Sequence, residues 1–136
     1  MRRSVAVLCL SLSALALASC GSTTSVAGFT GAKHEAAQAI ANLQSNATSA
    51  EQKKICSDDL AAALVARLGG ASHCETAIKN QLAEVDNLEA SVKSVELAAN
   101  GKTAIAQVKS IDEGKTVTSA VTLVKEDGKW KISGAG

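Results

Sequence analysis

Aromatic residues are almost absent from this chain of 136 residues, which contains one tryptophan, one phenylalanine and no tyrosine. Sugars, nucleobases and planar drugs are often bound by stacking on aromatic rings, so a site of that kind has little to be built from. Protein interfaces also draw much of their affinity from tryptophan and tyrosine. The composition therefore favours close packing of alanine, valine and leucine and, where a ligand is bound, one that is small or apolar.

A strong charge of either sign is also lacking. The formal net charge is +1, and without Arg2 and Arg3 the 14 basic residues become 12 against 13 acidic ones. No basic stripe is present to attract nucleic acid or anionic headgroups, so we expect no nucleic-acid partner. The sequence has no Walker loop, no dinucleotide fingerprint and no paired zinc-ligand motif, so we expect neither a cofactor nor a metal.

The N-terminal apolar stretch is short for a membrane span. Met1-Arg2-Arg3 precedes 14 uncharged residues from Val5 to Ala18, whereas a spanning helix needs roughly 20 apolar residues. A basic start followed by a short apolar run and small residues is typical of a secretory signal peptide. A retained spanning helix is the alternative, and the length of the stretch argues against it.

The apolar stretch ends in Leu17-Ala18-Ser19-Cys20, which resembles the lipobox of bacterial lipoproteins. The resemblance implies that Cys20 is acylated and begins the mature chain, with residues 1–19 as the signal peptide and residues 20–32 as a flexible, glycine-rich tether. Several acyl chains on one cysteine form a durable anchor, because each buried methylene contributes about 0.8 kcal/mol. We therefore expect a lipid-anchored protein on the extracytoplasmic face of the cell membrane.

Two cysteines remain for the folded part of the protein. Cys9 would leave with the signal peptide and Cys20 would carry lipid, which leaves Cys56 and Cys74. An even pair outside the cytoplasm is usually oxidised, so we predict a disulfide between them. It would close a loop of 17 intervening residues, and the chain-entropy treatment gives such a loop about 3 kcal/mol of stabilisation.

Histidines in the sequence leave two alternatives to this disulfide. Cys56, Cys74 and His73 could bind a metal together with His34, although structural zinc sites usually use two close-spaced ligand pairs. Cys74 could instead be a free nucleophilic thiol activated by His73. An even pair of cysteines outside the cytoplasm is usually oxidised, which favours the disulfide over both alternatives. We therefore expect no catalytic residue.

Residues 33–136 are predicted to form one α+β domain, with N-terminal helices packed on an antiparallel sheet of about four strands. Apolar spacings of three and four predict a first helix over 32–45, and capping boxes at Thr48/Glu51 and Ser72/Glu75 predict the starts of two more. From Ser91 the apolar period is two. Three turns separate the predicted strands: Asn100-Gly101, Asp112-Glu113-Gly114 and Asp127-Gly128.

The last two strands supply the candidate core or pocket residues, which are Val121, Leu123, Trp130 and Ile132. The run from Leu123 to Ile132, together with the order of helices before hairpins, resembles the NTF2-like superfamily and, more narrowly, small bacterial lipoproteins with a DUF4878-like domain. The resemblance implies a curved sheet wrapped on helices into a cone with a pocket. That fold hosts enzymes, ligand binders and structural modules alike.

Catalysis is not expected in this domain. Enzymes of the superfamily use a tyrosine or a protonated acid as oxyanion donor and an aspartate or histidine as base; this chain has no tyrosine, and neither His34 nor His73 is predicted to face the pocket. We expect a noncatalytic interaction or accessory module with a protein partner in the cell envelope. The alternative is a carrier that holds a small hydrophobic ligand in the cone.

Overall fold

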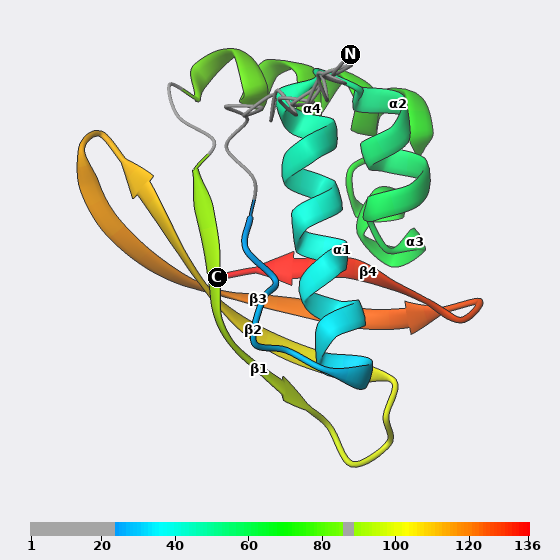
Figure 1. Ribbon diagram of the computed structural model, residues 1–136. Helices are drawn as coiled ribbons and strands as arrows, with labels where there is room; N and C mark the ends of the chain where they lie inside the picture. The colour runs from blue at the N-terminus through cyan, green and yellow to red at the C-terminus, as the bar shows by residue number, and fades with distance from the viewer. Residues whose placement is uncertain (1–23, 86–88) are drawn as a thin grey trace, which may run out of the picture.

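The computed structural model describes residues 24–85 and 89–136 and has an α+β fold in which an open, four-stranded antiparallel sheet follows the helices. The predicted class and the predicted four strands are confirmed. The elements follow in chain order (Figure 1): α1 Gly31–Thr48, α2 Gln52–Lys54, the π-helical turn η1 Ile55–Asp59, α3 Ala62–Arg67, α4 Ala71–Glu84, β1 Ala90–Leu97, β2 Thr103–Asp112, β3 Lys115–Glu126 and β4 Lys129–Ala135.

The sheet is a meander of order β1-β2-β3-β4 whose three turns lie where the sequence predicts them. Asp127 and Gly128 both have positive φ, 50° and 78°, and Glu113 and Gly114 have φ of 48° and 76°. Two successive residues of positive φ are typical of type I′ turns, whose twist matches that of the strands they join. Local turn chemistry therefore sets the register of β2 with β3, and that of β3 with β4 as far as the shift between Thr122 and Leu123.

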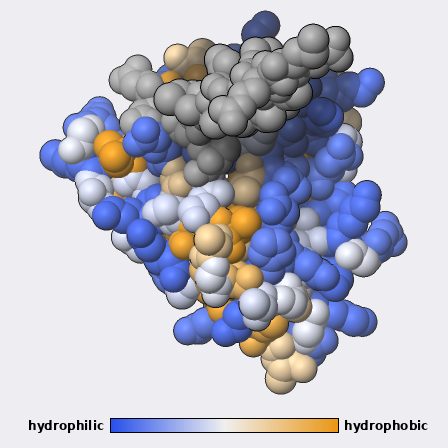
Figure 2. Space-filling view, viewed as in Figure 1, coloured by the Kyte–Doolittle hydropathy of each residue, from blue (hydrophilic) through white to orange (hydrophobic). Residues whose placement is uncertain are grey.

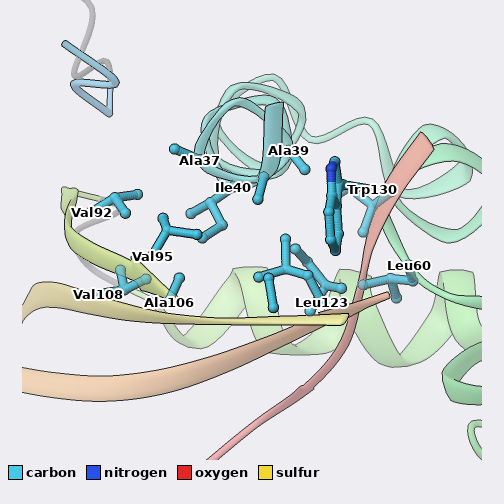
Figure 3. Close-up of a cluster of buried hydrophobic side chains, with 14 of the residues drawn as sticks. Ala37, Ala39, Ile40, Leu60, Val92, Val95, Ala106, Val108, Leu123 and Trp130 are labelled. Carbon is cyan, nitrogen blue, oxygen red and sulfur yellow. The ribbon is translucent and has the colours of Figure 1, made fainter. Parts of the chain in front are cut away.

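Helix α1 lies across the concave face of the curved sheet (Figure 1), and its buried residues Ala36, Ala37, Ala39 and Ile40 are part of the hydrophobic core. Small side chains on α1, among them Ala36 and Ala37 at 0% exposure, allow the helix to approach the sheet closely. The core formed below them is mainly aliphatic, with the indole of Trp130 among its side chains (Figure 3). Its main side chains are Ile40, Ile55, Leu60, Val92, Val95, Ala104, Ala106, Val108, Leu123, Trp130 and Ile132.

Trp130 is a core residue, as the sequence favours. It is 6% exposed, and its ring lies between α1 and Leu60 (Figure 3). The ammonium of Lys125 lies 5.7 Å from the ring centroid and 3.3 Å from the Glu35 carboxylate of α1. Packing and a cation–π contact thus fix the last strand against the first helix.

Helix ends differ most from the sequence prediction. Thr48 does not cap a second helix, because it is the last residue of α1 and its Oγ1 donates to the Gln44 carbonyl at 2.9 Å. Ser72 lies inside α4, which begins after Gly70 at φ 92°. Both predicted capping boxes are therefore wrong, since each serine or threonine lies within a helix.

The start of α3 is capped from another part of the chain. The backbone N–H of Ala62 donates to both carboxylate oxygens of Glu126, at 3.0 and 3.3 Å. Glu126 is the last residue of β3, so a strand end supplies the acceptor that an N-cap side chain usually supplies. A carboxylate at this position also complements the partial positive charge of the helix N-terminus.

Both edge strands of the sheet, β1 and β4, have a feature that limits their pairing with a strand from another molecule. On β4, the N–H of Ala61 donates to the Ile132 carbonyl at 2.8 Å, and Leu60 forms a parallel bridge with Ile132. On β1, the register shifts between Val92 and Ser94. This bulge places both Val92 and Val95, three residues apart, on the core side, so the period of two predicted from Ser91 onward is interrupted between them.

Part of the predicted tether packs on the domain. Thr24 is 6% exposed, Val26 and Phe29 pack against the core, and α1 already begins at Gly31. On the face of the molecule that is turned to the viewer in Figure 1, the space-filling view of Figure 2 shows a narrow band of hydrophobic side chains flanked by hydrophilic ones. The predicted signal peptide and Cys20 lie outside the described residues.

Candidate functional site

A cavity of about 730 Å³ lies between the helices and the sheet. We call it the apolar cavity, because most of the side chains around it are aliphatic. The helical part supplies Ile40, Leu43, Ala47, Ile55, Leu60, Leu64, Leu68, Ile78, Leu82 and Val85, and the sheet supplies Ala90, Val108, Ile111, Val117, Val121, Ile132 and Ala135. Binding sites for small molecules usually enclose roughly 300–1,000 Å³ and have mainly apolar walls.

The cavity exists because α4 packs on helices, while α1 covers the sheet. Helix α4 contacts α2, η1 and α3, and its apolar side chains Ile78, Leu82 and Val85 line the cavity. The helical period of the sequence predicts this apolar stripe. It does not predict that the stripe faces an open volume, since that depends on how two helical layers are placed.

The predicted disulfide between Cys56 and Cys74 is confirmed and holds this wall in place. It joins η1 to the first turns of α4, with the two Cα atoms 6.1 Å apart. Cys56 is 6% exposed and Cys74 is fully buried. Both sulfurs are bonded to each other, so the metal-ligand and free-thiol alternatives for this pair are wrong.

The rim of the cavity is unusually apolar. Val85, Ile111 and Val117 are 44%, 37% and 39% exposed, and they are three of the four large exposed hydrophobic side chains within residues 24–85 and 89–136. All three line the cavity. Hydrophobic side chains gathered at one place on a surface mark binding more often than scattered ones do.

The four residues predicted as core or pocket divide between two places. Val121 and Ile132 line the apolar cavity. Leu123, at 0% exposure, and Trp130 belong to the sealed core under α1 and are absent from the cavity lining. The alternation in β3 and β4 finds the inward side chains, and the position of α1 decides which of them are covered.

Polar side chains line one end of the cavity. Along the inward side of β2, Val108 is followed by Ser110 and then by Asp112 in the last position of the strand. Glu89, just before β1, and Ser119 of β3 are also among the lining residues. The lining is therefore aliphatic near η1 and mixed near the β2–β3 turn, where Ser110 and Asp112 lie beside the apolar Ile111. The remaining polar lining residues are Gln44 of α1 and Gln81 of α4.

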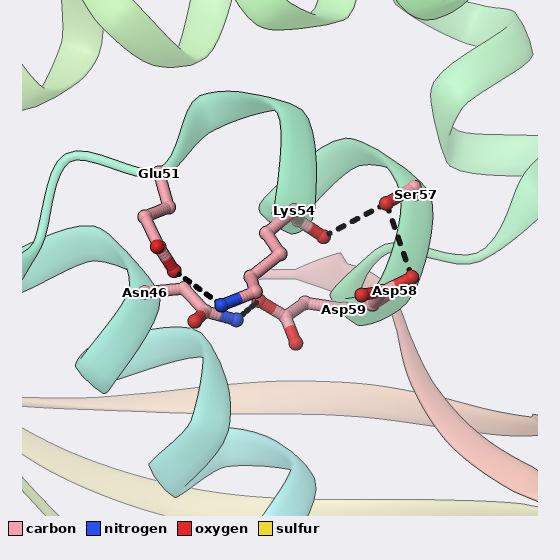
Figure 4. Close-up of polar contacts among 6 residues, drawn as sticks. All are labelled: Asn46, Glu51, Lys54, Ser57, Asp58 and Asp59. Atoms are coloured by element: carbon pink, nitrogen blue, oxygen red, sulfur yellow. Dashed lines mark hydrogen bonds and ion pairs between the residues drawn. The ribbon is translucent and has the colours of Figure 1, made fainter.

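A second polar cluster, away from the cavity, joins α1 to η1 (Figure 4). The Asn46 amide donates to the Asp59 carboxylate at 2.7 Å, and Asp59 is only 6% exposed. Burial raises the pKa of Asp59, and the Asn46 hydrogen bond opposes the rise. Lys54 forms an exposed ion pair with Glu51 at 2.8 Å. This cluster joins the two helical segments, and none of these four residues is among the cavity lining.

The other chemically reactive residues also lie apart from the cavity. His34 and His73 are exposed, and neither is among the lining residues, which include no lysine or arginine either. In the described ranges, no three His, Cys, Asp or Glu side chains gather as a metal ion would require. No helix in those ranges is long and apolar enough to cross a bilayer. The chemistry that the lining supports is the burial of an aliphatic group.

The chain was compared with protein-family models, with curated proteins and with solved structures, and none of the three comparisons gave a match.

Proposed function

We propose that this protein is a lipid-anchored, extracytoplasmic protein of the cell envelope whose NTF2-like domain binds without catalysis, with a small apolar ligand in the apolar cavity. The cavity is the observation that carries the proposal. Layers of secondary structure usually bury their apolar faces against one another, whereas here an apolar hollow of about 730 Å³, open to solvent at its rim, lies between the helices and the sheet. An apolar ligand would regain the dispersion contacts and the burial that its aliphatic walls otherwise lack.

A protein partner in the envelope is the second candidate, and the apolar rim of Val85, Ile111 and Val117 favours it. Native mass spectrometry of the protein purified from its own membrane separates the two. A copurified small molecule supports the carrier, and an empty domain that retains a protein partner supports the interaction module. The NTF2-like assignment itself rests on the run from Leu123 to Ile132 and on the order of helices before hairpins, and the cavity between the helices and the sheet supports it.

Partly filling the cavity should weaken ligand binding while leaving the fold intact. Val121→Trp places an indole among the lining residues of β3, so we expect at least a tenfold loss of affinity for an apolar probe. Ile105→Trp is the matched control, because Ile105 is 48% exposed and is not part of the lining. Equal affinity in the two variants, measured by calorimetry, would place binding outside the cavity.

Lipid attachment at Cys20 should be separable from the apolar stretch around it. Cys20→Ser is expected to abolish incorporation of labelled palmitate and to release the protein from the membrane fraction, because a single acceptor thiol is lost. Cys9→Ser, a change within the apolar stretch, should retain both the label and the membrane fraction. Palmitate retained in Cys20→Ser would refute the anchor.

A further inference from the structure

We infer that the ligand of the apolar cavity is an aliphatic amphiphile with a positively charged head, of the class of long-chain amines. This inference rests on the proposed ligand-binding function and adds the chemical class of the ligand. It is carried by three features of the described residues: the chemistry of the walls, the direction in which the lining becomes polar, and the sign of the charges at the polar end.

The walls fit an aliphatic chain better than a ring system. Leucine, isoleucine, valine and alanine make up the apolar lining, and no aromatic side chain is among the lining residues. Trp130, which could stack on a planar ligand, is buried in the core beneath α1. Without an aromatic face, the cavity offers dispersion contacts and burial of methylene groups, and each buried methylene contributes about 0.8 kcal/mol.

The lining also orients an amphiphile. Ile55, Leu60 and Ile132 form the end near η1, and each is 6% exposed or less. At the other end Ser110 and Asp112 continue the inward side of β2, and Ile111 and Val117 are exposed at the rim. A chain that enters from the rim therefore has its tail toward η1 and its head beside Asp112.

The charged side chains at the polar end of the cavity determine which head group of the ligand fits there. Glu89 and Asp112 are the ionisable residues of the lining, and no lysine, arginine or histidine is among them. Asp112 is exposed, and its side-chain carboxylate forms no side-chain hydrogen bond or ion pair within the described ranges. A carboxylate or phosphate head beside it would meet a like charge, whereas an ammonium would meet an opposite one.

Two nearby lysines do not reverse this preference. Lys109 lies with Glu89 in a smaller adjoining hollow of about 280 Å³ and is not part of the cavity lining. Lys115 is the register partner of Asp112 across the β2–β3 turn, yet it is also absent from the lining. Neither lysine is among the lining residues, and Lys115 forms no ion pair with Asp112 within the described ranges.

The test compares three ligands that share a twelve-carbon tail: dodecylamine, dodecanol and dodecanoate. The purified protein, transferred from detergent into an amphipathic polymer, is titrated with each ligand below its micelle concentration and followed by calorimetry. We expect dodecylamine to bind about fivefold more tightly than dodecanol, in keeping with one exposed charge pair. Its affinity should exceed that of dodecanoate by about tenfold or more. The preference should shrink at high ionic strength, because exposed charges are screened.

Variants of Asp112 assign the preference to this carboxylate. Asp112→Asn should bring the amine close to the alcohol, and Asp112→Lys should make the carboxylate the tighter ligand. Asp127→Asn, which changes a carboxylate in the turn between β3 and β4, should leave the order unchanged. Equal binding of all three ligands, or a preference for dodecanoate in the unaltered protein, would overturn the inference while leaving the binding function intact. Binding of none of the three would overturn the binding function itself.

Discussion

Serine in place of Cys56 or Cys74 should lower the free energy of unfolding by about 3 kcal/mol, because either change opens the same 18-residue loop in the unfolded chain. For a domain of this size the loss corresponds to a fall in melting temperature of roughly 10–20 °C. Denaturant unfolding followed by circular dichroism measures it. The two variants should be equal, since both sulfurs are buried, at 6% and 0% exposure of their residues.

Reduction of the unaltered protein provides an independent check of this prediction. With a reductant, the unaltered protein should lose about as much stability as either variant, and the variants themselves should not respond. Ser57→Ala is the matched control, because Ser57 adjoins Cys56 but is exposed, and we expect a change within about 0.5 kcal/mol. A difference of more than about 1 kcal/mol between the two cysteine variants would mean that the thiols have separate roles.

Leu123→Ala should cost about 3 kcal/mol, within the range of 2–5 kcal/mol typical of a buried leucine. Leu123 is fully buried and lies between Ala104 of β2 and Ile132 of β4 in the sheet register. Figure 3 shows it beneath α1 and beside Trp130. The neighbouring alanines are too small to refill the space, so the cavity left by the change should persist.

Ile105→Ala is the control for this core substitution. Ile105 lies on the neighbouring strand, but it is 48% exposed, so its truncation should cost less than about 1 kcal/mol. Urea unfolding of the two variants and the unaltered protein gives the comparison. A cost at Leu123 as small as that at Ile105 would show that α1 does not seal the centre of the sheet.

The element types of this fold can be predicted from the sequence because their signals are local. The period of two from Ser91 onward and the turn at Asp127-Gly128 depend only on neighbouring residues. Helix boundaries depend on distant ones: the first N–H of α3 is satisfied by Glu126, which is 64 residues away from Ala62. Thr48 continues α1 although its sequence context predicts a cap. Helix propensity is a local property of the sequence, so it cannot predict boundaries that depend on these contacts.

The candidate site could be predicted only in part. Alternation identifies Val121 and Ile132 as inward residues, and both line the cavity. The cavity itself depends on α4 packing on η1 and α3 instead of on the sheet, which no periodicity describes. One signal was present in the sequence: the alternate residues Val108, Ser110 and Asp112 become steadily more polar toward the β2–β3 turn, as an amphipathic lining requires.

The pairing of Ala61 with Ile132 at the β4 edge would have a consequence for copies held together on one surface by the proposed lipid anchor. A shared anchor would confine neighbouring domains to two dimensions and raise the frequency of their collisions. Free strand edges that collide can pair and grow into aggregates. Because the 2.8 Å bond from Ala61 already occupies the Ile132 carbonyl, and the bulge between Val92 and Ser94 interrupts β1, crowded copies have no continuous edge through which to polymerise.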